Sequence, residues 1–121
     1  MKTEILKAAQ KEEFETIERC RILEIANDAG DEFVSIARAR IGAGGQTAWH
    51  RLHGVAERYL IFSGKGRVEL TGKPPTEVVA VDVVRIPPGV SQRITNIGED
   101  DLLFYCICTP PFRQECYETL E

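Results

Sequence analysis

The chain of 121 residues is long enough for one hydrophobic core and too short for two, so we expect a single domain. Hydrophobic residues make up 43% and charged residues 28%, as in ordinary globular proteins. The net charge of -4, with basic and acidic residues interspersed, argues against a nucleic acid or a membrane as partner. The N-terminal sequence lacks the apolar segment of a secretory signal, and the longest apolar run, Leu102 to Cys108, is too short to span a bilayer. We therefore expect a cytoplasmic protein.

Residues 1–18 are mostly polar with scattered apolar positions, which predicts an N-terminal arm or a short helix. Residues 19–121 are expected to form the one folded domain. From Cys20 onward, apolar and polar residues alternate as in half-buried strands. The first such segments are 20–26, 33–41 and 47–52, and glycine-containing turns follow the first two.

The second half of the chain continues this pattern. Residues 57–63 and 67–70 flank Gly64-Lys65-Gly66 and are predicted to form a hairpin. Further strands are predicted over 77–81, 83–86, 91–97 and 101–109, and the tail 112–121 is polar and weakly patterned. About nine short strands with turns between them and no clear internal helix predict an all-β sandwich or barrel.

Two stretches carry a resemblance to a known family. Residues 44–64 read G-G-Q-T-A-W-H-R-L-H-G-V-A-E-R-Y-L-I-F-S-G, and residues 86–96 read I-P-P-G-V-S-Q-R-I-T-N. They resemble the two motifs of the cupin family, G-x5-H-x-H-x3or4-E-x6-G and G-x5-P-x-G-x2-H-x3-N. The resemblance covers roughly residues 40 to 112 and implies a double-stranded β-helix, or jelly-roll, barrel. In that family the histidines and the glutamate of these motifs often bind a divalent metal in the barrel mouth.

The histidine spacing departs from the family pattern. His50 and His53 are three residues apart, so on a regular strand they point to opposite faces. Either His50 and Leu52 face inward, or Arg51 and His53 do. The first register is favoured because an unpaired inward Arg51 would be costly to bury. His53 would then begin the loop, and both histidines could bind one metal only if the strand ends or bulges near Gly54.

The second motif departs more sharply, because Gln92 stands where the family has a histidine. A glutamine oxygen is a neutral and weaker ligand than imidazole for zinc, copper or iron. The resemblance thus implies a divalent metal ion on His50, Glu57 and Gln92, with His53 and waters as further ligands. The alternative is a polar pocket without metal, in which His50 is hydrogen-bonded to Glu57 or Gln92. Val81 replaces a family glycine, and the turn there is expected to lack a positive φ or to have another shape.

Other residues are placed by the strand pattern. Tyr59 and Asn96 share the proposed inward faces and are candidate pocket residues, although an Asn96 side chain that closes its turn is the favoured alternative. Cys106 and Cys108 share one strand face and are expected to be buried thiols; a redox pair or soft-metal ligation is the alternative. Trp49 lies on the outward face beside Arg51, which favours a subunit interface and a homodimer.

Two functions remain open from the sequence. The first is a metal-dependent enzyme on a small molecule, isomerase- or oxygenase-like, with the ion as Lewis acid. The second is a non-catalytic barrel that binds or senses a small ligand without metal. The retained His50 and Glu57 favour the first function, and Gln92 favours the second.

Overall fold

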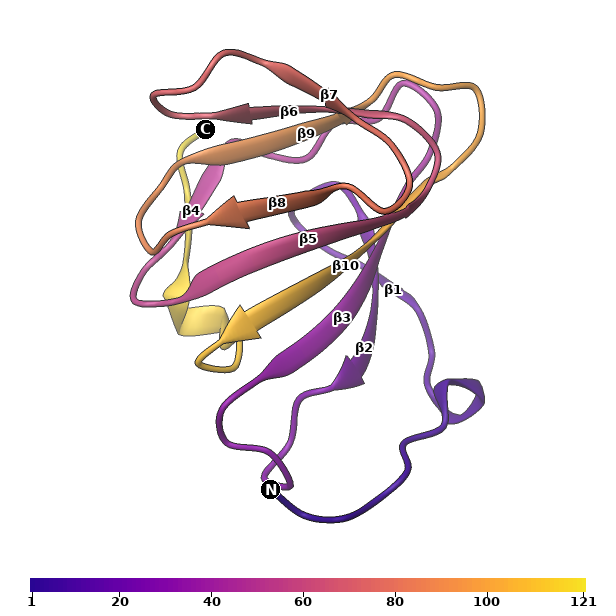
Figure 1. The fold of residues 1–121 in the computed structure, drawn as a ribbon, viewed down its shortest axis with the longest axis vertical. Coiled ribbons are helices and arrows are strands. Elements are labelled where there is room, and N and C mark those ends of the chain that lie inside the picture. Colours follow the sequence, from indigo (N-terminus) through magenta and orange to yellow (C-terminus); the bar gives the residue numbers. More distant parts are fainter.

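The protein is a barrel of two antiparallel sheets that pack face to face (Figure 1). The computed structural model describes residues 1–121, with eleven strands and two short 3-10 helices, η1 (Ala8–Gln10) and η2 (Gln114–Cys116). The predicted all-β class is confirmed. The six-stranded sheet has the order β1 (Phe14–Glu15), β2 (Arg21–Ala26), β3 (Ser35–Ile41), β10 (Leu102–Thr109), β5 (Ala56–Ser63) and β8 (Val83–Ile86). The five-stranded sheet has the order β11 (Tyr117–Thr119), β4 (His50–Leu52), β9 (Gln92–Asn96), β6 (Gly66–Leu70) and β7 (Thr76–Val78).

The alternation of residues along the strands determines which side chains face the barrel interior. Glu57, Tyr59 and Ile61 are buried on β5, and the residues between them are partly exposed. One apolar cluster surrounds Ile61 and Phe104, and a smaller one contains Val55 and Cys108. Glu57 therefore lies near the start of β5, between Tyr59 of the larger cluster and Val55 of the smaller one.

The predicted hairpin of residues 57–70 is wrong. β5 pairs with β10 and β8, whereas β6 pairs with β9 and β7 in the other sheet. The turn at Gly64 carries the chain from one sheet to the other. Gly64 has a φ of 90°, and a Cβ at this position would lie 2.7 Å from the carbonyl oxygen of Asp101. Gly64 is needed because the chain crosses tightly between the sheets at this point. The glycine-containing sequence had instead predicted a hairpin between neighbouring strands.

The turn before β8 also differs from the prediction. Val81 has a φ of 77°, so the position keeps the left-handed backbone for which the family motif has a glycine. Its amide donates to the carbonyl of Ile61, and the carbonyl of Asp82 accepts from the amide of Ile61. These two bonds to β5 hold a β-branched residue in a conformation that its side chain disfavours.

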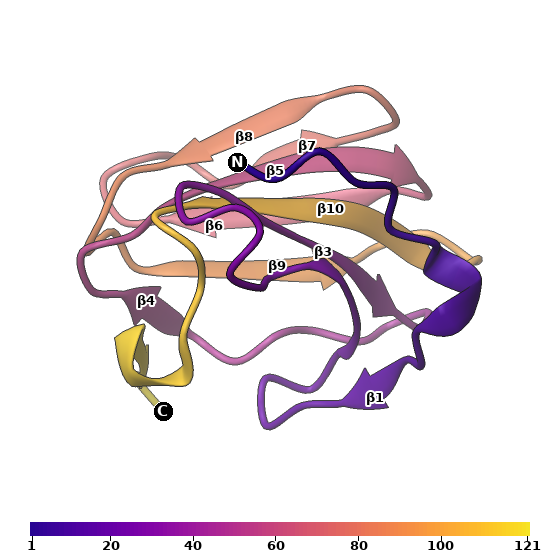
Figure 2. The same cartoon turned by 90° about the horizontal axis from the view of Figure 1, so that it is seen from below.

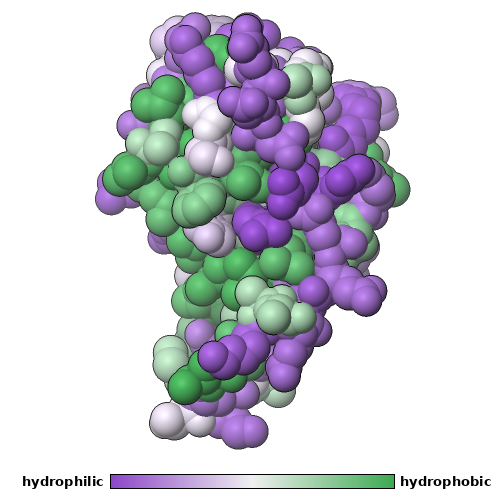
Figure 3. All heavy atoms as spheres, turned by 90° about the vertical axis from the view of Figure 1, so that its right-hand side faces the viewer, coloured by the Kyte–Doolittle hydropathy of each residue, from purple (hydrophilic) through white to green (hydrophobic).

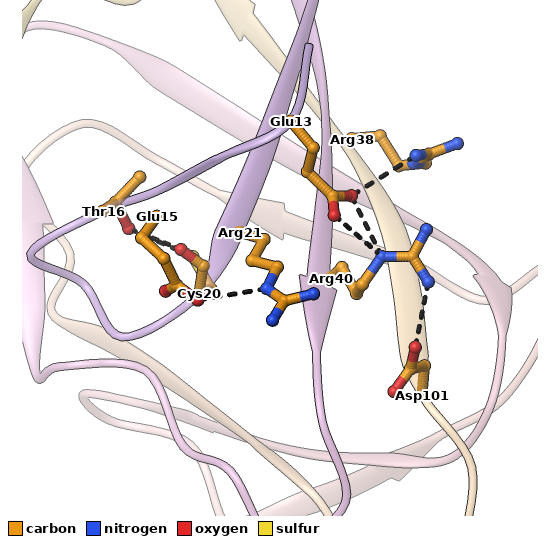
Figure 4. Close-up of polar contacts among 8 residues, drawn as sticks. All are labelled: Glu13, Glu15, Thr16, Cys20, Arg21, Arg38, Arg40 and Asp101. Atoms are coloured by element: carbon orange, nitrogen blue, oxygen red, sulfur yellow. Dashed lines mark hydrogen bonds and ion pairs between the residues drawn. The ribbon is translucent and has the colours of Figure 1, made fainter.

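Both ends of the chain add to the barrel. β11, in the tail that has no clear sequence pattern, pairs with β4 and places Thr119 opposite His50. The N-terminal segment curves around the outside of the barrel to β1 (Figure 2). Its Glu13 carboxylate accepts from Arg38 and Arg40 of β3, and Arg40 also donates to Asp101 (Figure 4).

Hydrophobic side chains are also exposed on the side of the molecule that carries the N-terminal segment (Figure 3). Ile5, Phe14, Ile17 and Phe33 are among the exposed large apolar residues. No helix of the protein has the length and apolar character needed to cross a membrane.

Candidate functional site

A cavity of about 640 Å³ lies against the six-stranded sheet, and residues 14–18, which begin with its edge strand β1, form one wall. Glu57 and Tyr59 reach it from β5, and Phe104, Cys106 and Cys108 reach it from β10. Residues 112–115, just after β10, close another side. The cavity is large enough for a small organic molecule and has both apolar and polar walls.

Glu57 is the central polar residue of this cavity. The residue is only 8% exposed, and its Oε1 atom has no hydrogen-bond partner. Its Oε2 atom accepts a weak bond from the thiol of Cys108, with 3.7 Å between sulfur and oxygen. Burial raises the pKa of Glu57 to about 7, against the opposing effect of the Gln92 amide and the Cys108 and Cys106 thiols. A carboxyl group in this state can give or take a proton near neutral pH.

Gln92 lies beside His50, because these residues are direct cross-strand partners of β9 and β4. The hydroxyl of Tyr59 donates to Oε1 of Gln92, which orients the amide. Its Nε2 atom is then left buried without a partner, near the Glu57 carboxyl but outside hydrogen-bond geometry. The side chain therefore presents unused N–H donors.

His50 faces the interior and His53 does not. His50 is 2% exposed, whereas the His53 side chain is 55% exposed and its ring contacts the Glu118 carboxylate. β4 ends before His53, and Gly54 has a φ of 70°. The structure thus has the register in which Arg51 stays at the surface, where it also binds Glu118 at 2.7 Å.

The protonation state of His50 follows from its contacts. Its Nδ1–H donates to the carbonyl of Ala48 over 2.6 Å, so Nε2 carries the lone pair. Burial lowers the pKa of His50, and the ring is stacked on Tyr117 with 5.0 Å between centroids. We therefore assign a neutral imidazole whose Nε2 faces the carboxyl of Glu18 at 3.6 Å.

Glu18 is a site residue that the sequence did not reveal. It belongs to the N-terminal segment, lines the cavity, and has a pKa raised to about 7 by burial and by repulsion from Glu57. The family motifs begin well after this position, and one glutamate in a polar arm has no distinguishing pattern. Only the folded arrangement brings Glu18 and Glu57 to the same cavity.

Asn96 lies apart from the cavity, and all its polar atoms are used. Its Nδ2 atom donates to the carbonyls of Ile41 at 2.9 Å and Asp100 at 2.8 Å, and its Oδ1 atom accepts from the amide of Gly98. These bonds close the turn after β9.

Cys106 and Cys108 are unreactive free thiols, and Trp49 packs against an arginine. Cys106 and Cys108 are free, and burial raises the pKa of both, so they are protonated and poorly nucleophilic. Trp49 is covered by the guanidinium of Arg93, 5.1 Å from the ring centroid.

The side chains present do not match the donor set of the divalent metal site implied by the resemblance. Gln92 uses its oxygen to accept from Tyr59 and offers only N–H donors, which cannot bind a cation. His53 points to the surface, and no group of three or more histidine, cysteine, aspartate or glutamate side chains is arranged to hold an ion. Of the four ligands that the resemblance implies, only His50 and Glu57 face the interior with a free donor atom.

Comparisons with known proteins support the fold. The family described as "Cupin domain" matches residues 37–108. The uncharacterized protein MJ1618 of Methanocaldococcus jannaschii is 34% identical over 87 residues, which span 72% of this chain and 69% of that protein.

Solved structures of similar shape have low sequence identity. A variant of Streptomyces Pac13 with uridine has a TM-score of 0.82 at 14% identity, covering 100% of this chain and 93% of that one. A predicted oxalate decarboxylase from Thermotoga maritima has a TM-score of 0.76 at 21% identity, covering 88% and 99%. A Klebsiella pneumoniae protein with a double-stranded β-helix domain has a TM-score of 0.78 at 13% identity, covering 99% of both chains. At these identities, the likeness concerns the fold alone.

Proposed function

Because the chain belongs to the cupin family, we propose that its barrel binds a small organic molecule and acts on it by general acid–base catalysis through Glu57. The observation that carries this proposal is the Glu57 carboxyl, which lines the cavity with Oε1 unpaired and has a pKa of about 7. Perturbed carboxyl groups in clefts are frequent at catalytic sites. Isomerisation and elimination are reaction classes that need such a proton transfer.

The neighbouring side chains have supporting roles in this proposal. Gln92 is buried outside the cavity lining, so its amide, oriented by Tyr59, acts on the Glu57 carboxyl beside it rather than on a ligand. Glu57 and Tyr59 both line the cavity and would orient a bound molecule at the reacting atom. His50 and Glu18 are the second proton-holding pair, on the side of the N-terminal segment.

Two structural neighbours suggest where to look for substrates. Pac13 is described as a nucleoside dehydratase and is bound to uridine, and the Thermotoga protein is described as a predicted oxalate decarboxylase. A first panel of compounds therefore contains nucleosides such as uridine, small carboxylic acids, sugars and simple amines.

Hydrogen exchange with solvent tests the proposal without knowledge of the full reaction. The protein is incubated with each compound in D2O, and NMR detects deuterium that replaces a carbon-bound proton. We expect exchange with at least one compound, and a rate about 100-fold lower in Glu57→Gln, the usual magnitude for a lost acid or base. Exchange that is equally fast in Glu57→Gln would remove Glu57 from the mechanism.

Non-catalytic ligand binding is the first alternative, and the loss of the family histidine at Gln92 favours it. Under this alternative, compounds shift the NMR signals of cavity residues but exchange no protons. The panel thus separates binding from catalysis in the same samples.

Metal-dependent catalysis is the second alternative, because His50 and Glu57 occupy family ligand positions. Elemental analysis of protein purified without a metal-affinity column tests it, together with melting curves with and without a chelator. Near-stoichiometric metal and a chelator-sensitive melting temperature would favour this alternative. They would contradict the conclusion that the side chains present do not fit a divalent metal.

A further inference from the structure

We propose that the ligand of this cavity is an organic cation, such as a protonated amine, with an apolar body, and that Glu57 and Glu18 bind its charged group. The proposal rests on the small-molecule binding proposed above and specifies the chemical class of the ligand. It is carried by the charges that line the cavity, by the missing cationic partners of the buried Glu57 and the partly buried Glu18, and by the apolar walls around them.

The charged residues that line the cavity are nearly all acidic. Carboxyl groups of Glu15, Glu18, Glu24, Glu57 and Glu115 reach it, and Arg113 is the only basic residue among the lining side chains. Such a lining attracts cations and repels anions, since the surrounding protein screens charge less than water does. A phosphorylated or carboxylated ligand would therefore be disfavoured.

The two deepest of these carboxyl groups lack the cationic partners that other carboxylates in this protein have. Glu13 is bound by Arg38 and Arg40, Glu69 by Arg93, and Glu118 by Arg51, with nitrogen–oxygen distances of 2.7–3.4 Å. Glu18 has only His50 Nε2 at 3.6 Å, and Glu57 has only the Cys108 thiol at 3.7 Å. Oε1 of Glu57 has no partner at all, although the residue is more than nine-tenths buried.

A bound ammonium group would supply what these carboxyls lack. It carries N–H donors for the unpaired oxygen of Glu57 and a positive charge for both glutamates. A neutral ligand could supply a donor but no charge, so the two carboxyls together favour a cation.

The apolar walls of the cavity indicate the chemistry of the uncharged part of the ligand. Apolar residues of the arm, β2, β3, β10 and the segment after β10 line the cavity, and they include Phe14, Ile17, Ile22, Phe104 and Phe112. Tyr59 is in contact with Phe104 at the base, with 4.6 Å between ring centroids. Aromatic faces attract cations as well as apolar groups, so an alkyl or aryl amine fits these walls better than a sugar.

Three probes with the same apolar body and different charge test the proposal: benzylamine, benzyl alcohol and benzoate. Each is titrated into the isotope-labelled full-length protein, and the signals of Glu57, Cys106 and other cavity residues are followed by NMR. Benzylamine is expected to bind at least about tenfold more tightly than benzyl alcohol, because a hydrogen bond to a charged group is stronger than a neutral one. Benzoate is expected to bind more weakly than either.

Isosteric variants then locate the contact. Glu57→Gln and Glu18→Gln should each lower the affinity for benzylamine at least about tenfold while leaving that for benzyl alcohol nearly unchanged. The matched control is Glu99→Gln, an exposed carboxylate outside the cavity lining, which should change neither affinity more than about twofold. Two separate variants keep the test valid if one of them does not fold.

The outcomes separate this proposal from the wider function. Equal or tighter binding of benzyl alcohol or benzoate would overturn the cation proposal and leave small-molecule binding intact. Undiminished benzylamine binding in both Glu57→Gln and Glu18→Gln would also overturn it. Failure of all three probes to perturb cavity signals would overturn it as well, and the deuterium-exchange panel would then decide separately on the proposed catalysis.

Discussion

Glu57 holds a proton near neutrality because it lies between two apolar clusters and no arginine or lysine reaches it. Desolvation disfavours the ionised form of such a group, and only weak donors oppose that effect. Desolvation also raises the pKa of the partly buried Glu18, and repulsion from Glu57 adds to this effect. Two carboxyl groups in one cavity thus share an electrostatic penalty that a bound proton or cation relieves.

The stability of the folded state should therefore fall as pH rises through neutrality. The pKa of Glu57 is raised from 4.5 to about 7 on folding, so the native state binds more protons than the unfolded state between these values. The contribution of the protonated Glu57 carboxyl to stability is fully present below pH 4.5 and is lost as the pH rises toward and through 7. We expect urea unfolding of the wild type to show a Glu57-dependent loss of roughly 2 kcal/mol between pH 5 and pH 8.

Glu57→Gln isolates this effect, because glutamine has the same shape and does not titrate. The variant should be more stable than the wild type at pH 8 and should differ much less at pH 5. A wild type and variant whose stabilities change with pH in parallel would contradict the raised pKa.

At the scale of elements, the turn before β8 contains a conformational conflict that a single substitution can relieve. Val81 has a φ of 77° and is 79% exposed, so its side chain contributes little packing and is sterically disfavoured. Val81→Gly should raise the free energy of unfolding by about 1 kcal/mol, after the entropy cost of glycine is subtracted.

The matched control for this turn is Val83→Gly, in the regular strand β8, where the valine is 56% exposed. Glycine there removes a β-branched residue from an extended backbone and should destabilise the protein. Chemical denaturation of both variants measures the two effects. A Val81→Gly variant as destabilised as Val83→Gly would show that the turn does not strain the valine.

The segment that carries Glu18 is attached to the barrel by Arg19. Arg19 donates to the carbonyls of Gln46 and Thr47, and its guanidinium makes two bonds to the carboxylate of Glu121. Glu121 also accepts from the amide of Trp49, so this carboxylate joins the C-terminal end to the segment just before β4.

Arg19→Ala should loosen residues 14–18 without unfolding the barrel. We expect faster amide hydrogen exchange in this segment and unchanged protection in β5 and β10, because local opening does not require global unfolding. Mass spectrometry of exchanged peptides measures both regions in one experiment. Equal acceleration in β5 and β10 would mean that Arg19 stabilises the whole fold.

For the whole molecule, local patterns predicted the strands better than their partners. Alternation located β3, β5, β9 and β10, and the cost of burying Arg51 indicated which histidine faces inward. Gly64 correctly predicted a turn. A glycine does not indicate whether the strands on either side of the turn pair with each other or belong to different sheets. β11 and Glu18 lie in polar terminal segments whose structure depends on contacts with distant residues.

The homodimer expected from Trp49 and Arg51 stays a prediction. Light scattering after size-exclusion chromatography tests it, and Trp49→Ala should shift a dimer toward monomer if that face forms the interface.

The most direct test of the acid–base proposal is an NMR titration of the Glu57 carboxyl carbon in the ligand-free protein, assigned by its absence from Glu57→Gln. The predicted result is a pKa of about 7, which falls when Glu18→Gln removes the neighbouring carboxyl. A carboxyl that titrates near 4.5 would mean that Glu57 is fully ionised at neutral pH and would contradict its role as the proton-transfer group of this barrel.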